Sequence, residues 1–130
     1  MPIGNSKVLY AIGGSAGSVP VFTLQPIDVY DIDAGETAVF TAAADDTNTW
    51  QWEVEDPNES GTWTTDLATV FGGRASGITT DTLTITGVDV VDNRGVRVVA
   101  TGSASITSNE VVLFIASNIL WSSWTTEEVA

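Results

Sequence analysis

A run of seven residues, 49–55, constrains the fold more than any other part of this sequence. It reads Thr-Trp-Gln-Trp-Glu-Val-Glu, so Trp50, Trp52 and Val54 alternate with one glutamine and two glutamates. Side chains of a β-strand point alternately to its two faces, whereas a helix would spread these residues around its axis. The run therefore predicts a strand with one buried and one solvated face, with Trp50 and Trp52 in the core.

The same alternation recurs between clusters of turn residues along most of the chain. Strands are predicted over residues 24–32, 37–44, 62–65, 82–85, 96–101 and 109–115. Pro26 restricts the first of these strands to a sheet edge. Residues 66–80 are expected to be irregular and 92–95 to form a turn, and no segment is assigned to a helix. The inward positions of these strands add further core residues: Phe40, Ala42, Leu83, Ile85, Val96 and Val98.

Two segments of different character flank the predicted strands. Residues 1–23 form a glycine- and serine-rich N-terminal arm, and residues 117–130 form a C-terminal tail. Both carry apolar side chains that belong to no predicted strand: Val8, Leu9, Tyr10, Ile12, Ile119, Leu120, Trp121 and Trp124. Aromatic anchors dominate the energetics of interfaces, so these residues are the predicted partner interface. The alternative is that the tail folds back and covers an open edge or end of the domain.

The charge of the chain is strongly unbalanced and excludes several partners. Seventeen carboxylates face four lysines and arginines, which gives a formal net charge of −13. A surface of this sign repels phosphate backbones and anionic membranes, so nucleic-acid binding is not expected. Membrane insertion is not expected either, because no stretch approaches the roughly 18 apolar residues of a membrane span. The apolar run after Lys7 is too short for a secretory leader, and we expect a protein that is not exported by that route.

The chain contains neither cysteine nor histidine. Disulfides and nucleophilic catalysis by Ser–His or Cys–His pairs are therefore excluded, and zinc and copper lose their usual ligands. We expect no enzymatic activity and no cofactor, although a carboxylate pair of the glycosidase type stays open. The absence of cysteine also predicts folding in a reducing bacterial cytoplasm.

Acidic residues gather around the first predicted turn and raise the question of a calcium site. Asp28, Asp31, Asp33 and Glu36 lie within nine residues, and hard cations require several converging oxygens. Asp31 and Asp33 are the candidate ligands. The alternative is that acidic residues occupy turns because they cap and solvate the backbone there.

Several segments, in order, resemble the immunoglobulin-like domains of bacterial surface proteins and tailed-phage structural proteins. The matching segments are Gly-Glu-Thr-Ala-Val-Phe-Thr-Ala (35–42), Gly-Thr-Trp-Thr (61–64), Thr-Leu-Thr-Ile-Thr-Gly-Val (82–88), Asn-Arg-Gly-Val-Arg-Val-Val-Ala (93–100) and Ser-Asn-Glu-Val-Val-Leu (108–113). Trp52 falls at the position of the family's core tryptophan. Ala42 and Val98 stand where the family has its two cysteines, and Val96 stands where it usually has a corner tyrosine.

The resemblance implies an all-β, immunoglobulin-like β-sandwich over residues 24–116, with about seven antiparallel strands and no disulfide. It also implies that Ala42 and Val98 pack against Trp52 in place of a cystine.

Fold alone does not determine function. The interpretation we favour is a non-enzymatic structural or decoration protein of a tailed-phage virion, assembled in the host bacterial cytoplasm. Its terminal segments would dock on capsid or tail protein, with a second copy or a surface glycan as further candidate partners. The rival interpretation is an adhesion or carbohydrate-binding module of a bacterial cell surface.

Overall fold

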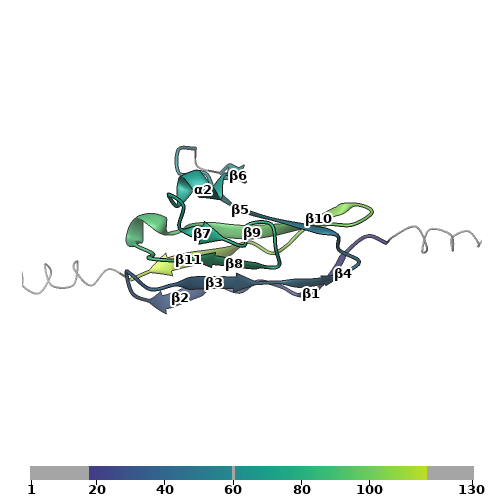
Figure 1. The fold of residues 1–130 in the computed structure, drawn as a ribbon, viewed down its shortest axis with the longest axis horizontal. Coiled ribbons are helices and arrows are strands. Elements are labelled where there is room, and N and C mark those ends of the chain that lie inside the picture. The colour runs from purple at the N-terminus through teal and green to yellow at the C-terminus, as the bar shows by residue number, and fades with distance from the viewer. Residues whose placement is uncertain (1–17, 60, 117–130) are drawn as a thin grey trace, which may run out of the picture.

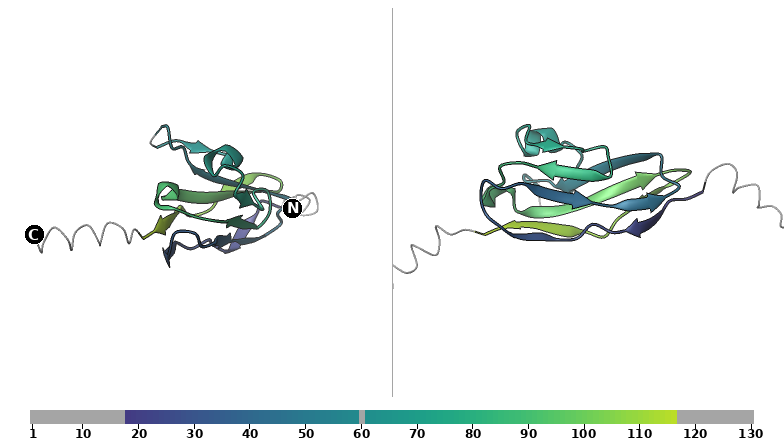
Figure 2. Two further views of the ribbon diagram at one scale, coloured as in Figure 1. Left: turned by 60° about the vertical axis from the view of Figure 1, so that its left-hand side comes forward. Right: turned by 60° about the horizontal axis from the view of Figure 1, so that its bottom comes forward.

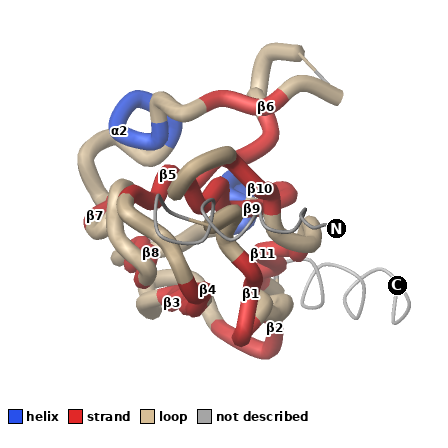
Figure 3. The backbone as a smooth tube through the Cα atoms, turned by 90° about the vertical axis from the view of Figure 1, so that its right-hand side faces the viewer, coloured by secondary structure: helices blue, strands red, loops and turns tan. Residues whose placement is uncertain are grey.

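The computed structural model describes residues 18–59 and 61–116, which form an elongated β-sandwich (Figure 1). The larger, six-stranded sheet has the order β2 (Val29–Ile32), β11 (Val111–Ile115), β9 (Arg94–Thr101), β5 (Thr49–Glu55) and β6 (Trp63–Thr64), with β10 (Ser105–Thr107) also paired to β9. The three-stranded sheet consists of β3 (Ala38–Thr41), β8 (Thr82–Ile85) and β7 (Ala75–Ser76). Viewed end-on, β3, β8 and β7 lie to one side and β9, β11 and β2 to the other (Figure 3).

The first predicted strand is in fact two strands that belong to different sheets. β1 (Val21–Leu24) runs antiparallel to β4 (Ala43–Asp45), whereas β2 runs parallel to β11. The chain crosses between them at the buried Pro26, which has no N–H to donate to a ladder. β1 begins at Val21, within the segment 1–23 that the sequence assigned to the arm.

Side chains of the crossing segment complete the hydrogen bonding of the strand it joins. The amide oxygen Oε1 of Gln25 accepts from the N–H of Asn109, and a carboxylate oxygen of Asp28 accepts from the N–H of Val112, both at 2.9 Å. Buried or edge backbone groups need such partners where no neighbouring strand supplies one. The crossing at Pro26 is therefore tied to the last strand at both ends.

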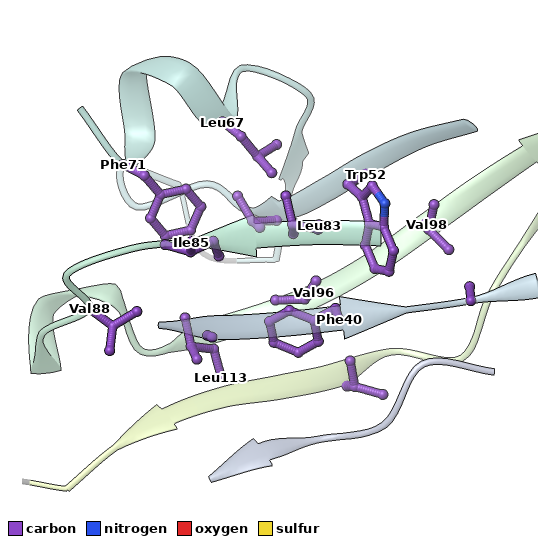
Figure 4. Close-up of a cluster of buried hydrophobic side chains, with 14 of the residues drawn as sticks. Phe40, Trp52, Leu67, Phe71, Leu83, Ile85, Val88, Val96, Val98 and Leu113 are labelled. Carbon is purple, nitrogen blue, oxygen red and sulfur yellow. The ribbon is translucent and has the colours of Figure 1, made fainter. Parts of the chain in front are cut away.

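The core contains the residues that strand alternation placed inward, with one exception. Phe40, Ala42, Trp52, Leu83, Ile85, Val96 and Val98 are buried. Trp50 is only half-buried: it packs on the rim of the core, with its ring centroid 6.3 Å from that of Phe22 on β1. The centre of the sandwich is a contact between Trp52 and Phe40, whose rings lie 6.2 Å apart, with Val98 close by (Figure 4).

Trp52 joins the two sheets by hydrogen bonds as well as by packing. Its backbone N–H donates to the oxygen of Ile78 (2.9 Å), and its indole Nε1–H donates to the oxygen of Thr80 (2.7 Å). Both acceptors lie in the loop between β7 and β8, so the bonds run from one sheet to the other. Gly77 opens this loop at φ +73°, and a Cβ there would overlap the backbone oxygen of Thr82. We call Trp52 and this loop (77–81) the Trp52 clasp.

Residues 66–80, expected to be irregular, contain a short helix and a strand. Asp66 caps helix α2 (Leu67–Val70) by accepting from the N–H of Thr69 at 3.3 Å. Leu67 and Phe71 from this turn are buried in the core (Figure 4). One helical turn is too short to show periodicity in the sequence, which is why it was missed.

A second link between the sheets lies near the end of the sandwich where β11 ends. The Arg74 guanidinium donates to both carboxylate oxygens of Asp92 at 2.9 Å, and also to the oxygens of Thr86 and Gly87. Arg74 leads into β7, and Asp92 ends the 3-10 helix η1 (Val90–Asp92) before β9. We call this ion pair the Arg74 clasp. The bond to Asp92 raises the pKa of Arg74 above its ordinary value although burial opposes this, so the cation stays charged.

The predicted turn at 92–95 is wrong, because β9 already begins at Arg94. Arg94 donates to the backbone oxygens of Val91 (2.8 Å) and Glu55 (3.1 Å), which anchors η1 to β5. Its guanidinium and that of Arg74 both lie within 6 Å of the centroid of the buried Phe71 ring, at 5.8 and 5.9 Å. The turn-like composition of this segment reflects a capped 3-10 helix that precedes the strand.

The described chain enters at one end of the sandwich and leaves at the other. Ser18 lies beside the β9–β10 hairpin, where its oxygen accepts from the N–H of Ser103. Ala116 follows β11 at the opposite end (Figures 1 and 2). Segments that precede and follow the sandwich therefore start from opposite poles.

Candidate interaction surface

The outer face of the six-stranded sheet carries both an apolar patch and a group of ion pairs. In one row across it, Val112 of β11 stands opposite Gly95 of β9, and Glu55 of β5 stands opposite Trp63 of β6. The N–H of Gly95 donates to the Glu55 carboxylate at 2.8 Å and joins the two halves of the row. This face has an apolar half on β2 and β11 and a polar half on β9, β5 and β6.

The polar half is organised around Arg97. Its guanidinium carbon lies 4.2 Å from the centroid of the Trp63 ring. Its Nε donates to Glu53 at 2.7 Å, and its Nη1 lies 3.7 Å from a carboxylate oxygen of Glu110. A guanidinium stacked on an aromatic ring and held by two carboxylates is already satisfied. Arg97 covers one face of Trp63, so that face of the ring offers no platform on which a sugar could stack.

The apolar half is a patch of three side chains. Tyr30, Val112 and Phe114 are 61%, 47% and 53% exposed. Val29 and Leu113 are register partners in the parallel pair β2–β11 and both face the core, so Tyr30 and Phe114, one residue later, both face outward. Val112 lies two residues before Phe114 and faces the same way. These three residues are the Tyr30 patch.

The remaining exposed large apolar side chains do not cluster on this face. Four of them lie in or beside β1 and the crossing segment, namely Val19, Val21, Leu24 and Ile27. The other three are Val39 on β3 and Val90 and Val91 on η1. Single exposed apolar residues are normal on protein surfaces and need no functional explanation. The Tyr30 patch differs because its members are neighbours on adjacent strands.

Two polar hollows lie at the ends of the sandwich. One is formed by Ser18, the turn 44–48 and the turn at Gly102–Ser103, where a Cβ on Gly102 would overlap the backbone oxygen of Asp46. The other lies between residues 55–57 and the segment around Arg94. Turn backbone and carboxylates line both hollows, and neither brings together residues that form a recognisable catalytic arrangement.

The acidic residues around the first turn do not converge on one point. Within residues 18–59 and 61–116, no three side chains from Asp, Glu, His or Cys are placed to hold a metal ion together. Asp28 accepts from the backbone of Val112, and Glu36 accepts from the N–H of Asp33 at 3.2 Å. Asp31 and Asp33, the candidate calcium ligands, are both exposed. Asp28 and Glu36 thus bond to backbone amides, as in the alternative interpretation of the cluster.

The residues predicted as the partner interface lie outside the described part of the chain. These residues are Val8, Leu9, Tyr10, Ile12, Ile119, Leu120, Trp121 and Trp124. The Tyr30 patch was missed, although the sequence carried a signal for it. The strand 111–115 is apolar on both faces, with Val112 and Phe114 opposed to Val111, Leu113 and Ile115. A strand that is apolar on both faces is buried on both or presents one apolar face to a partner.

No family model matches the chain, and no curated protein sequence matches it either. Among the residues described, no helix has the length and hydrophobicity required to cross a membrane.

Solved structures with the same fold are numerous, and the three named here are distant in sequence. A chimeric titin Z1Z2 protein has a TM-score of 0.55 at 21% identity, with 77% of this chain and 96% of that chain covered. Tandem Ig repeats of Dlar have a TM-score of 0.55 at 23% identity, with 78% and 49% covered. Extracellular domains 3–5 of Drosophila OTK have a TM-score of 0.58 at 18% identity, with 76% and 32% covered.

The chain thus spans about half of the Dlar fragment and about a third of the OTK fragment. At these identities the likeness establishes the fold alone. The expected fold class is confirmed: the described chain is an immunoglobulin-like β-sandwich without a disulfide.

Proposed function

We propose that this chain is a non-enzymatic structural protein of a tailed-phage virion that displays one immunoglobulin-like domain on the head or tail. The terminal segments attach it to capsid or tail protein, and the acidic sandwich faces the solvent. The observation that carries this proposal is how the two sheets are joined. The Trp52 clasp and the Arg74 clasp use no cystine, which suits a domain that folds and assembles in a reducing cytoplasm.

The positions at which the described chain enters and leaves also support attachment through both terminal segments. Ser18 and Ala116 lie at opposite poles, so partners that hold both segments would orient the sandwich lengthwise (Figure 1). The charge of −13 disfavours association with a second copy and favours partners with basic surfaces.

A bacterial cell-surface adhesion or carbohydrate-binding module is the second candidate. The location of Ser18 and Ala116 at opposite poles favours this candidate equally, because domains with their ends so placed can be arranged in a line along a longer chain. Its glycan-binding form is less favoured by the described surface, because Arg97 covers a face of Trp63 and holds two carboxylates.

The experiment that separates the candidates is incorporation into virions. The full chain and variants that lack residues 1–17, 117–130 or both are expressed during phage assembly, and copies per particle are counted by quantitative mass spectrometry. The N-terminal cut precedes Ser18 because Ser18 and Pro20 pack against the turn at Gly102. We expect the full chain in the particle and at least about a tenfold loss for the double truncation, equivalent to about 1.4 kcal/mol of binding.

Thermal unfolding of each truncated protein is the control for folding. Full incorporation of a folded protein that lacks both segments would contradict attachment through them. Absence of the full chain from particles would contradict the virion role itself.

A further inference from the structure

The Tyr30 patch presents aromatic and aliphatic surface to solvent on the outer face of the six-stranded sheet. Tyr30 and Phe114 are neighbours on β2 and β11, which lie side by side along one edge of the sandwich (Figure 2). Each is more than half exposed. A contiguous exposed apolar cluster on a sheet face marks a surface that is covered in some state of the protein.

Carboxylates border this patch and restrict what covers it. Asp28 bonds to the backbone of Val112, Asp31 adjoins Tyr30 on β2, and Glu110 precedes β11 with its side chain 64% exposed. Of these three carboxylates Glu110 has a cation nearby, Arg97 at 3.7 Å. Two copies packed patch to patch would bring Asp28 and Asp31 of one copy close to those of the other, which costs free energy. The covering segment must therefore be apolar and free of negative charge.

We infer that residues 117–126 of the same chain cover the Tyr30 patch in the free protein. This segment reads Ser-Asn-Ile-Leu-Trp-Ser-Ser-Trp-Thr-Thr and carries no charge, and the glutamates at 127 and 128 come only after it. Its apolar residues are Ile119, Leu120, Trp121 and Trp124. Its composition therefore meets both requirements of the patch.

The segment 117–126 begins close to the patch, because the described chain ends just after β11. β11 carries Val112 and Phe114 and ends at Ile115, and the N–H of Ala116 donates to the oxygen of Ile32 at 3.4 Å. Ile119 follows Ala116 by three residues, a reach of about 10 Å for extended chain. Ser117 and Asn118 are residue types that favour a turn. Residues 1–17 precede Ser18, which lies at the opposite pole of the sandwich.

This inference concerns the protein before it meets a partner and goes beyond the proposed function. Because this segment begins three residues after Phe114, its effective concentration at the patch is high, on the order of millimolar for a short linker. A virion partner that binds the tail would have to displace it from the patch.

The test is a double-mutant cycle in the full chain, read as the melting temperature, Tm. Trp121→Ser is combined with Val112→Ser and Phe114→Ser on the patch. The matched control combines Trp121→Ser with Val39→Ser, because Val39 on β3 is 49% exposed and Val112 is 47% exposed. We expect Trp121→Ser to lower Tm by about 5 °C alone and by under about 1 °C when the patch is already changed.

In the control cycle the effects of Trp121→Ser and Val39→Ser should add. The patch coupling should be the same at all protein concentrations, because the contact is intramolecular. No change of Tm with Trp121→Ser, or additive effects at the patch, would overturn the inference. A coupling that grows with concentration would also overturn it and assign the patch to a second copy. None of these outcomes bears on virion incorporation, which is measured separately.

Discussion

The two clasps join the same pair of sheets by different chemistry. In the Trp52 clasp a fully buried indole and its own backbone N–H donate to the oxygens of Thr80 and Ile78. In the Arg74 clasp a guanidinium with a side chain 33% exposed binds a carboxylate that is 3% exposed. One clasp is uncharged and central, and the other is ionic and lies near the end of the sandwich. The domain thus has two links between its sheets without a cystine.

The difference predicts how each region responds to change. A buried aromatic residue contributes through the volume it fills, so its removal leaves a cavity that the surroundings fill only in part. A buried ion pair contributes little net stability, but loss of one partner leaves the other charge unpaired. The central clasp should therefore dominate stability, and the ionic clasp should matter mainly when it is broken on one side.

The largest effect is expected from Trp52→Ala, which removes the indole from the centre of the core. We expect a loss of about 4 kcal/mol in the free energy of unfolding, measured by urea denaturation followed by far-UV circular dichroism. Domains of this size are stable by only about 5–15 kcal/mol, so the substitution should remove between about a quarter and most of the stability. Trp63→Ala is the control, because Trp63 is an outer-face tryptophan, and it should cost less than about 1.5 kcal/mol. Equal losses would show that Trp52 is not the central link.

The second-largest loss of stability is expected from Gly77→Ala, which tests the loop of the Trp52 clasp. Gly77 has φ +73°, and its Cβ would overlap the oxygen of Thr82, so the loop must shift away from Trp52. We expect a loss of about 3 kcal/mol, from about 1–2 for the left-handed backbone and the rest from weakened bonds to Trp52. Gly73→Ala is the matched control: Gly73 has φ +85° and no atom within 4 Å of its Cβ, so only the backbone cost applies. A loss as small as that of Gly73→Ala would contradict the close approach to Thr82.

Much of this architecture could be predicted from the sequence because strand alternation is local. The run at 49–55, and Leu83 and Ile85, are strands whose buried faces follow directly from period two. That Val98 stands beside Trp52, with Ala42 buried in the same core, was implied by the resemblance, since no local pattern marks a missing cystine. The ionic pairing of Arg74 with Asp92 joins residues 18 apart and has no local signal.

Other features depend on tertiary contacts that no short window of sequence contains. The switch at Pro26 needs β4 on one side and β11 on the other, so a single strand over 24–32 was the natural prediction. Trp50 alternates like a core residue but lies at the rim, because its strand extends beyond the three-stranded sheet toward Phe22. The Tyr30 patch requires the parallel register of β2 with β11, which only the folded sheet defines.

The third-largest loss of stability is expected from Arg74→Met, which removes one partner of the ion pair in the Arg74 clasp. The Asp92 carboxylate then stays buried with the N–H of Asp89 as its remaining partner at 2.9 Å. We expect a loss of about 2 kcal/mol, below the usual cost of a fully buried pair because the Arg74 side chain is partly exposed. The raised pKa of Arg74 means that its contribution is fully present below the ordinary arginine pKa and is lost only at still higher pH.

The loss in Arg74→Met should consequently be the same from about pH 6 to about pH 9 in urea denaturation. A loss that changes steeply within that range would show that some other group titrates at this end of the sandwich.

The smallest effect is expected from the same substitution at Arg97. Arg97 also pairs with a carboxylate and also approaches an aromatic ring, yet it lies within one sheet, and its partners Glu53 and Glu110 are 18% and 64% exposed. Water can solvate these carboxylates when the guanidinium is removed, so Arg97→Met should cost only about 0.5 kcal/mol, and added salt should reduce that cost further. Urea denaturation at low and high salt measures both quantities. If Arg97→Met costs as much as Arg74→Met, the burial of Asp92 and its link between sheets do not set the strength of the ionic clasp. If Arg97→Met costs less than Arg74→Met and its cost falls with salt, the burial of Asp92 sets the strength of the ionic clasp. The ion pairs of Arg97 on the exposed face then contribute little to stability.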